Sequence, residues 1–290
     1  MPKLSIRVFF RRLLIFLPLA FLSACLPQPA LHGELHGQLL WQGEVRLWGN
    51  IILAEDAVLT IAPGTRIIFL PLDPAADTLR EHPFFPGSEL IVRGRIIARG
   101  TKDQPISFQF VDSSAPAGSW GGINIEGSSR AIFNYCSFRQ ADSAIHARNS
   151  RVVVENSLFT DNLVAIRFHD ADIRIENNLL HNNGTAIRFH FGAPLIRKNV
   201  IRNNRKGLFI TSAPRGYRIE NNSFLDNQPY QVTLGEGVRE DVVLKNNYWG
   251  AQGMAALLPW VYDGRLDDWL GTIEFQPLRS KPDQDAGIHQ

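Results

Sequence analysis

The chain has 290 residues, with 30 lysines and arginines, 28 aspartates and glutamates, and two cysteines. Its length fits one elongated domain with a sizeable core, and no linker-like stretch divides it. The near balance of charge and the absence of any nucleic-acid motif exclude a nucleic-acid partner.

The first 25 residues are predicted to be a signal peptide outside the fold. Four basic residues precede an apolar run from Leu13 to Phe21, which is too short to span a membrane as a mature helix. The run ends in Leu22-Ser-Ala-Cys25, which resembles the lipobox of bacterial lipoproteins. An ordinary secretory signal with an incidental cysteine is the alternative.

The lipobox resemblance implies that Cys25 becomes a lipidated N-terminus and anchors the protein in the bacterial cell envelope. Leu26 follows the cysteine, which in the best-known sorting rule favours the outer membrane. Cleavage would remove four of the 30 basic residues and no acid, leaving 26 bases against 28 acids. Cys136 would then remain, and we expect a buried thiol that acts as a small hydrophobe.

The mature chain is predicted to begin with a spacer and an N-terminal cap. Residues 26–37 are expected to be an extended or poorly ordered spacer, and the folded domain is expected to cover residues 38–277. Alternating apolar residues between residues 38 and 70 predict the N-terminal cap and first coil. Residues 71–87 contain four prolines and interrupt the alternation, so they are predicted to be an insertion loop.

A block of about 21 residues recurs from Phe133 to Trp249. Short alternating runs such as Ile173-Arg-Ile175 predict half-buried strands, and Asn-Asn, Asp-Asn or Gly between them predicts turns. Units of this length cannot bury a core alone, so they must stack, with like residues about 4.8 Å apart. The fourth positions of the six blocks are spaced by 21, 21, 21, 23 and 25 residues: Cys136, Ser157, Asn178, Asn199, Asn222 and Asn247.

Stacking predicts inward columns of like residues. Four columns are apolar: Phe133, Val154, Ile175, Ile196, Ile219 and Leu244; Phe138, Phe159, Leu180, Ile201, Phe224 and Trp249; Ile145, Ile166, Ile187, Leu208 and Val232; and Ala147, Phe168, Phe189, Ile210 and Leu234. Asn178, Asn199, Asn222 and Asn247 are expected to form an inward ladder at one turn, because each amide both donates and accepts. Asn162, Asn183, Asn204 and Asn227 mark the next turn.

This pattern resembles the right-handed parallel β-helix repeat of the pectate-lyase-like superfamily. The segments Leu90–Thr101 and Gly118–Gly122 are similar to the N-terminal coils of bacterial β-helix proteins, and Asn246-Asn-Tyr-Trp-Gly250 is similar to their closing segment. The resemblance implies an all-β fold: a single-stranded right-handed parallel β-helix with N- and C-terminal caps. Its regular coils would cover about residues 130–250 and its C-terminal cap residues 251–277, with a mobile tail at 278–290. The fold hosts lyases, hydrolases and non-catalytic proteins alike, so it does not give the function.

Arginine and histidine recur on the outward side of one predicted strand. They form two columns across three coils: His146, Arg167 and Arg188, and two residues further on Arg148, His169 and His190. We expect one compact outward patch that binds the carboxylate or phosphate of an anionic glycan or lipid headgroup, more strongly below about pH 6.5 as the histidines become charged. A solvated face without a ligand is the alternative.

Enzymatic activity is the rival interpretation. A hydrolase of this fold needs two carboxyl groups at a defined separation, and a lyase typically needs an acid cluster that binds Ca²⁺. No such pair occurs on the repeat strands, and Glu155, Glu176 and Glu220 share one repeat position that we expect to be a solvated edge. We therefore expect no catalytic residue, no metal and no cofactor.

One outward column is apolar and consists of Leu158, Leu179 and Val200. Adjacent exposed aliphatic residues predict a covered surface. The C-terminal segment is the expected cover, and contact with a protein partner is the alternative. The sequence thus predicts a lipid-anchored, non-catalytic envelope protein that binds a glycan or other polyanion or has a structural role, with a polysaccharide-active enzyme as the alternative.

Overall fold

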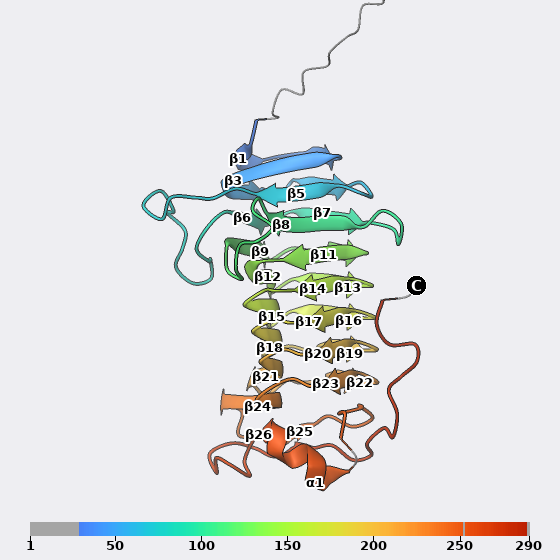
Figure 1. The fold of residues 1–290 in the computed structure, drawn as a ribbon. Helices are drawn as coiled ribbons and strands as arrows, with labels where there is room; N and C mark the ends of the chain where they lie inside the picture. The colour runs from blue at the N-terminus through green and yellow to red at the C-terminus, as the bar shows by residue number, and fades with distance from the viewer. Residues whose placement is uncertain (1–28, 252, 289–290) are drawn as a thin grey trace, which may run out of the picture.

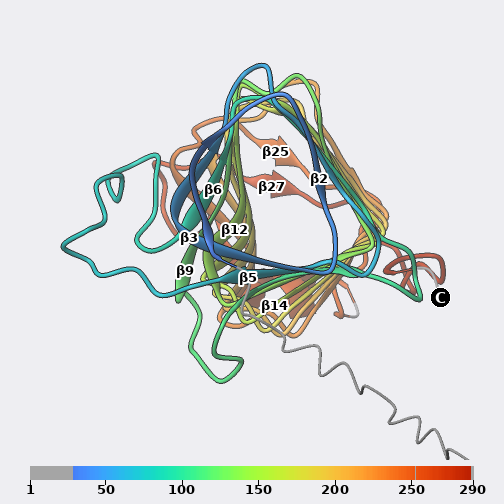
Figure 2. The same ribbon diagram turned by 90° about the horizontal axis from the view of Figure 1, so that it is seen from above.

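A computed structural model describes residues 29–251 and 253–288. The predicted signal peptide and Cys25 lie outside the described residues. Parallel strands wind into an elongated stack of coils, and each coil has three sides when viewed along the stack (Figure 1, Figure 2). The predicted all-β parallel solenoid is confirmed.

Each side of the stack is a face of parallel strands. Face 1 is an eight-stranded sheet: β2 (Gln38–Trp41), β4 (Val58–Ile61), β7 (Arg95–Arg99), β10 (Ala131–Asn134), β13 (Arg151–Glu155), β16 (Asp172–Glu176), β19 (Leu195–Arg197) and β22 (Arg218–Glu220). Face 2 comprises β5 (Arg66–Phe69), β8 (Ile106–Phe110), β11 (Cys136–Arg139), β14 (Leu158–Thr160), β17 (Leu179–His181), β20 (Val200–Arg202) and β23 (Ser223–Leu225).

Face 3 carries the predicted Arg/His columns. It comprises β1 (Leu31–Leu35), β3 (Glu44–Leu53), β6 (Glu89–Val92), β9 (Trp120–Glu126), β12 (Ala141–Arg148), β15 (Val164–His169), β18 (Thr185–His190), β21 (Lys206–Ser212), β24 (Tyr230–Gly237) and β26 (Val261–Tyr262). The long strand β3 pairs with β5 through its first half and with β6 through its second half. Faces 2 and 3 are thereby joined into one 17-stranded sheet.

The inward columns stack in register between the faces. Phe159 pairs with Leu180 and Leu180 with Ile201, and all three side chains are fully buried. Aromatic rings stack from coil to coil in the same way, with 4.6 Å between the ring centroids of Phe138 and Phe159. Because every coil repeats the same apolar positions, one continuous core runs along the stack.

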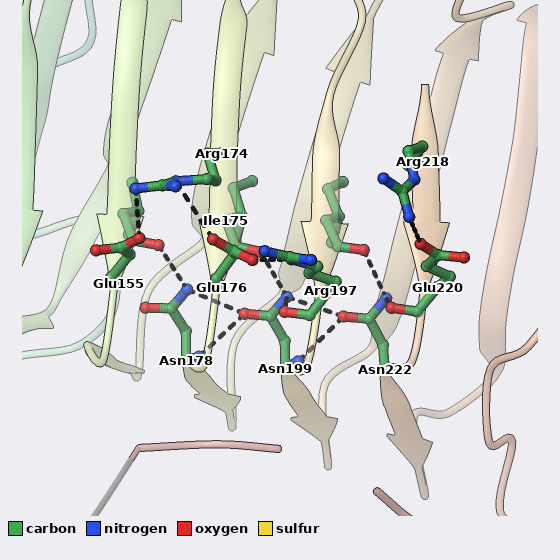
Figure 3. A network of polar contacts seen from close by, with 12 residues as sticks. Glu155, Arg174, Ile175, Glu176, Asn178, Arg197, Asn199, Arg218, Glu220 and Asn222 are labelled. Carbon is green, nitrogen blue, oxygen red and sulfur yellow. Dashed lines mark hydrogen bonds and ion pairs between the residues drawn. The ribbon is translucent and has the colours of Figure 1, made fainter. Parts of the chain in front are cut away.

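Buried asparagines hold the turn between faces 1 and 2 (Figure 3). Asn178 Nδ2 donates to Asn199 Oδ1 at 3.0 Å, Asn199 Nδ2 to Asn222 Oδ1 at 2.9 Å, and Asn222 Nδ2 to Asn247 Oδ1 at 3.0 Å. The residue before each of the first two, Asn177 and Lys198, adopts a left-handed backbone with φ of 55°. The turn therefore repeats with identical geometry, and each amide satisfies its neighbour.

The two ends of the stack differ. The C-terminal end is closed by α1 (Met254–Leu257), η1 (Leu258–Trp260) and the strand pair β25 (Val242–Val243) and β27 (Ile273–Glu274). At the other end, strand β1 lies within the segment expected to be a spacer and pairs with β3. The spacer prediction for residues 26–37 is therefore wrong from Leu31 onward, because β1 begins the first coil.

The C-terminal tail packs on the solenoid, contrary to the mobile tail predicted for residues 278–290. Arg279 Nη1 donates to Asn221 Oδ1 at 2.8 Å, and the Gly287 amide donates to the Lys198 carbonyl at 2.8 Å. The described part of the tail runs back along the stack towards its middle coils (Figure 1). The sequence did not predict these contacts, because the tail has no apolar run. The contacts are made by the backbone and by one arginine side chain.

Candidate functional site

The two Arg/His columns lie in register on face 3. His146 pairs with Arg167 and Arg167 with Arg188 in successive strands β12, β15 and β18. Arg148, His169 and His190 pair in the same way two residues further on. The structure thus brings all six residues together on one face.

The insertion loop, residues 71–87, forms a wall over this face. Asn124 Nδ2 donates to the Pro83 carbonyl at 3.1 Å, and the Phe85 amide donates to Glu89 Oε1 at 2.9 Å. The Phe85 ring lies 5.2 Å from the His146 ring. His146 is consequently only 2% exposed, so the expectation that it belongs to an exposed patch is wrong.

Beside the loop, the columns line a pocket of about 280 Å³. Its lining comes from four strands of face 3 and from the loop: His82, His146, Arg167, Phe168, His169, Arg188, Phe189, His190 and Thr211. Arg148 lies outside this lining, although its neighbour His169 is part of it. The pocket has the size for one compact ligand group or one sugar unit.

The guanidinium groups of the pocket pack against aromatic rings and form no ion pair with an acid among the described residues. Arg167 Cζ lies 4.9 Å from the centre of the Phe85 ring, and Arg188 Cζ lies 5.2 Å from that of Phe209. Neither arginine forms an ion pair with any described residue. Burial and the neighbouring charge of Arg188 lower the pKa of Arg167 to about 10, so Arg167 stays charged near neutral pH.

Several pocket nitrogens have no hydrogen-bond partner within the described residues. Arg167 Nε, His146 Nδ1 and His169 Nδ1 are buried in this way. Buried polar groups in folded proteins are nearly always paired, so these unpaired nitrogens indicate unused hydrogen-bonding capacity beside the pocket. Asp142 is the acid that interacts with Arg167, and burial raises the pKa of its carboxyl group.

The histidines differ in how readily they can be charged. Burial and the charge of Arg167 lower the pKa of His146 to about 3, so His146 stays neutral. Burial and His169 also lower the pKa of His190, whose ring stacks 5.1 Å from that of His169. The predicted onset of stronger binding at pH 6.5 is therefore too high for these two residues.

We expect anion binding to strengthen only as the pH falls below the ordinary histidine value of 6.5. A protonated ring adds positive charge to the pocket, and the lowered pKa of His190 moves that gain to more acidic solution. Dissociation constants at about pH 7.5, 6.5 and 5.5 test this, with His190→Gln expected to reduce the gain. A gain that is complete by pH 6.5 would contradict the assignment to His190.

The loop residues His82 and Phe85 and the strand residue Thr211 were not among the predicted site residues. Thr211 Oγ1 lies 3.3 Å from His190 Nδ1, and the His82 ring lies 6.2 Å from the His146 ring. The two loop residues do not repeat with the coil, so the column pattern carries no signal for them. The four prolines predicted that this segment is a loop, but they did not predict which face of the solenoid the loop covers.

The recurring glutamates are paired with arginines (Figure 3). Arg174 Nη2 lies 2.7 Å from Glu155 Oε1, and Arg174 Nε lies 3.3 Å from Glu176 Oε2. Arg197 also pairs with Glu176, and Arg218 with Glu220. The Glu176 side chain is only 7% exposed, so the expected solvated edge is instead an ion-pair network.

Among the residues that the structure describes, no three His, Cys, Asp or Glu side chains gather closely enough to hold a metal ion. Over residues 29–251 and 253–288, no helix is long and apolar enough to cross a membrane.

The apolar column on face 2 is partly covered by the tail. Leu158, Leu179 and Val200 are half-buried, and a methyl group added to Gly287 would approach Val200 Cγ2 to 3.2 Å. The C-terminal segment therefore covers Val200. Contact of a protein partner with this column stays a prediction.

Comparison with known proteins assigns the repeat. Residues 109–251 match the family model for a right handed beta helix region. No curated protein and no solved structure matches the chain. The matched residues include every strand that lines the pocket, whereas the insertion loop lies before them.

Proposed function

Because the chain is a right-handed parallel β-helix repeat protein, we propose that its face 3 pocket binds an anionic group of a glycan without catalysis. The ligand group is a carboxylate, sulfate or phosphate carried on a sugar. Lipid on Cys25 anchors the protein in the bacterial envelope, with the outer membrane as the expected location.

The two guanidinium groups, which form no ion pair with a described residue, carry this proposal; Asp142 interacts with Arg167, but burial raises the pKa of its carboxyl group. Arg167 and Arg188 occupy adjacent coils, about 4.8 Å apart, in the same column. The charge of Arg188 lowers the pKa of Arg167, so the two positive charges repel each other unless an anion intervenes. Arg167 lines the pocket, and its buried Nε is unpaired among the described residues, so its hydrogen-bonding capacity is not used by the protein.

The surroundings of the pocket support binding rather than sugar cleavage. Hydrolysis in this fold needs two carboxyl groups at a defined separation, one of which must be free to act as a base or nucleophile. The described pocket lining contains neither Asp nor Glu, and the recurring glutamates pair with arginines on face 1. Glu89 is fully buried under the loop, and burial raises its pKa to about 9.

A glycan array tests the proposal with the mature protein. We expect weak, salt-sensitive binding to glycans that carry carboxylate, sulfate or phosphate groups, and none to their neutral counterparts. Each glycan that binds is then incubated with the protein and examined for shorter products. Binding with release of products would favour the polysaccharide-active enzyme, and no preference for anionic glycans would reject the proposed ligand class.

The anchor is tested separately through its cysteine. Cys25→Ala removes the thiol that lipidation requires, so we expect an unlipidated protein that is either soluble or retained as precursor. Cell fractionation with lipid labelling measures the result, and Cys136→Ser is the control because Ser157 occupies the same repeat position one coil later. Unchanged lipid labelling and membrane retention of the Cys25→Ala variant would contradict the lipoprotein assignment.

A further inference from the structure

We propose that the N-terminal end of the solenoid rests on the lipid surface that holds the anchor, so that the stack of coils projects away from the membrane. The inference rests on the proposed lipidation of Cys25. It adds an interaction surface, formed by β1, β2 and the start of β3, with a lipid bilayer as its partner.

The first coil exposes apolar side chains whose partners in the next coil are fully buried. Leu31 pairs with Leu47 in the register of face 3, and Leu39 pairs with Leu59 in that of face 1. Leu47 and Leu59 are fully buried, but Leu31 and Leu39 are only half-buried. Among the described strands, β1 pairs only with β3 and β2 only with β4, so the end of the core is open.

Further apolar surface surrounds this open end. Leu40 is 63% exposed on β2. A pocket of about 350 Å³ lies beside it and is lined mainly by apolar residues, including Pro29, Leu31, Trp41 and Val45. The same pocket contains Arg46, whose Nε lies 3.7 Å from Glu44 Oε1 and whose side chain is partly exposed. Apolar contacts next to a partly exposed guanidinium fit the boundary between the acyl chains and the headgroups of a bilayer.

The tether to the anchor is too short to hold this end away from a membrane. Pro29 is four residues after Cys25. A fully extended chain spans at most about 3.6 Å per residue, so these four residues reach about 14 Å. Acyl chains on Cys25 insert into the bilayer, which places the first coil at the headgroup layer. The strand edges still need hydrogen bonds from water or headgroups, so this end lies at the interface and does not enter the hydrocarbon.

The opposite end is built differently. The C-terminal cap buries Leu257 fully, and Trp249 and Phe275 are also buried. The open end therefore occurs where the proposed anchor is attached, whereas the capped end points away from it (Figure 1). In this orientation β12 lies four strands beyond β1 on face 3, so the anion pocket begins about 19 Å further from the membrane.

Lipid-quenching fluorescence on the lipidated full-length protein tests this orientation. Two variants are prepared in a Cys136→Ser background, and each is labelled with an environment-sensitive fluorophore at a new cysteine. Leu40→Cys places the probe at the open end. Trp269→Cys places the control probe near the capped end, at a site that is 74% exposed. The proteins are reconstituted in vesicles of phosphatidylethanolamine and phosphatidylglycerol that contain brominated lipid. We expect a blue shift and quenching for the Leu40 probe and neither change for the Trp269 probe.

Mass spectrometry of the N-terminal peptide from the same samples tests the lipidation of Cys25 separately from the orientation of the solenoid. Lipid on Cys25 with a Leu40 probe that stays unquenched would overturn the orientation and leave the anchor intact. Absence of lipid on Cys25 would remove the anchor and the orientation together. If Leu40→Cys fails to fold, as judged by its circular dichroism, Trp48→Cys replaces it, because Trp48 is 44% exposed on β3.

Discussion

Replacing both Arg167 and Arg188 by alanine is expected to weaken binding of an anionic glycan by about 100-fold or more at low salt. Each charge-assisted hydrogen bond contributes about 1.5–3 kcal/mol, and a tenfold change in affinity corresponds to about 1.4 kcal/mol. The melting temperature should stay close to that of the wild type, because neither arginine forms an ion pair with a described residue. Isothermal titration and thermal unfolding measure the two effects.

A double variant elsewhere on the surface provides the matched control. Arg202 and Arg205 are exposed, and their replacement by alanine removes the same charge from the protein. If binding depended only on net charge, both double variants would lose affinity equally. If the wild type and the Arg167→Ala, Arg188→Ala variant bound with equal affinity, the alternative interpretation would hold, in which these residues form a solvated face without a ligand.

Asn199→Leu is expected to destabilise the solenoid by about 4 kcal/mol, since two or more buried polar groups each lose a partner at a cost of about 1–3 kcal/mol. Asn199 Nδ2 donates to the Ile175 carbonyl, the Arg197 carbonyl and Asn222 Oδ1, and Asn199 Oδ1 accepts from the Asn178 amide and side chain. Leucine replaces none of these bonds. A lower midpoint of urea unfolding, followed by circular dichroism, measures the loss.

Asn50→Leu serves as the control for this variant. Asn50 also lies in the solenoid, on β3, but its Oδ1 has no hydrogen-bond partner among the described residues. We therefore expect a much smaller change in the unfolding midpoint. Similar losses for Asn50→Leu and Asn199→Leu would show that the ladder is not the source of the stability.

The repeated part of the fold was predictable because stacking multiplies each signal. Phe159, Leu180 and Ile201 have no helical spacing in common, but they recur at one position of a coil and are buried together. The same repeat spacing predicted that the arginines and histidines form columns on one face. The position of a residue that repeats with the coil could thus be predicted from the sequence, but not its environment: Glu176 was expected in a solvated edge and lies in an ion-pair network.

Features that occur once could not be placed in this way. The insertion loop brings Phe85 over Arg167 and buries His146, and nothing in the repeat indicates the direction of the loop. Burial then lowers the pKa of His146, which changes the expected response to pH. Strand β1 was missed because its pairing with β3 is a long-range contact outside the regular repeat.

A crystal structure of the protein with an oligosaccharide that carries carboxylate or sulfate groups tests the central claim most directly. We expect one anionic group in the face 3 pocket, within hydrogen-bond distance of the guanidinium groups of Arg167 and Arg188, at about 2.7–2.9 Å. The sugar ring should lie against the rings of His169 and His190, which line the pocket. An oligosaccharide bound on another face, or an empty pocket at a saturating concentration, would contradict the account.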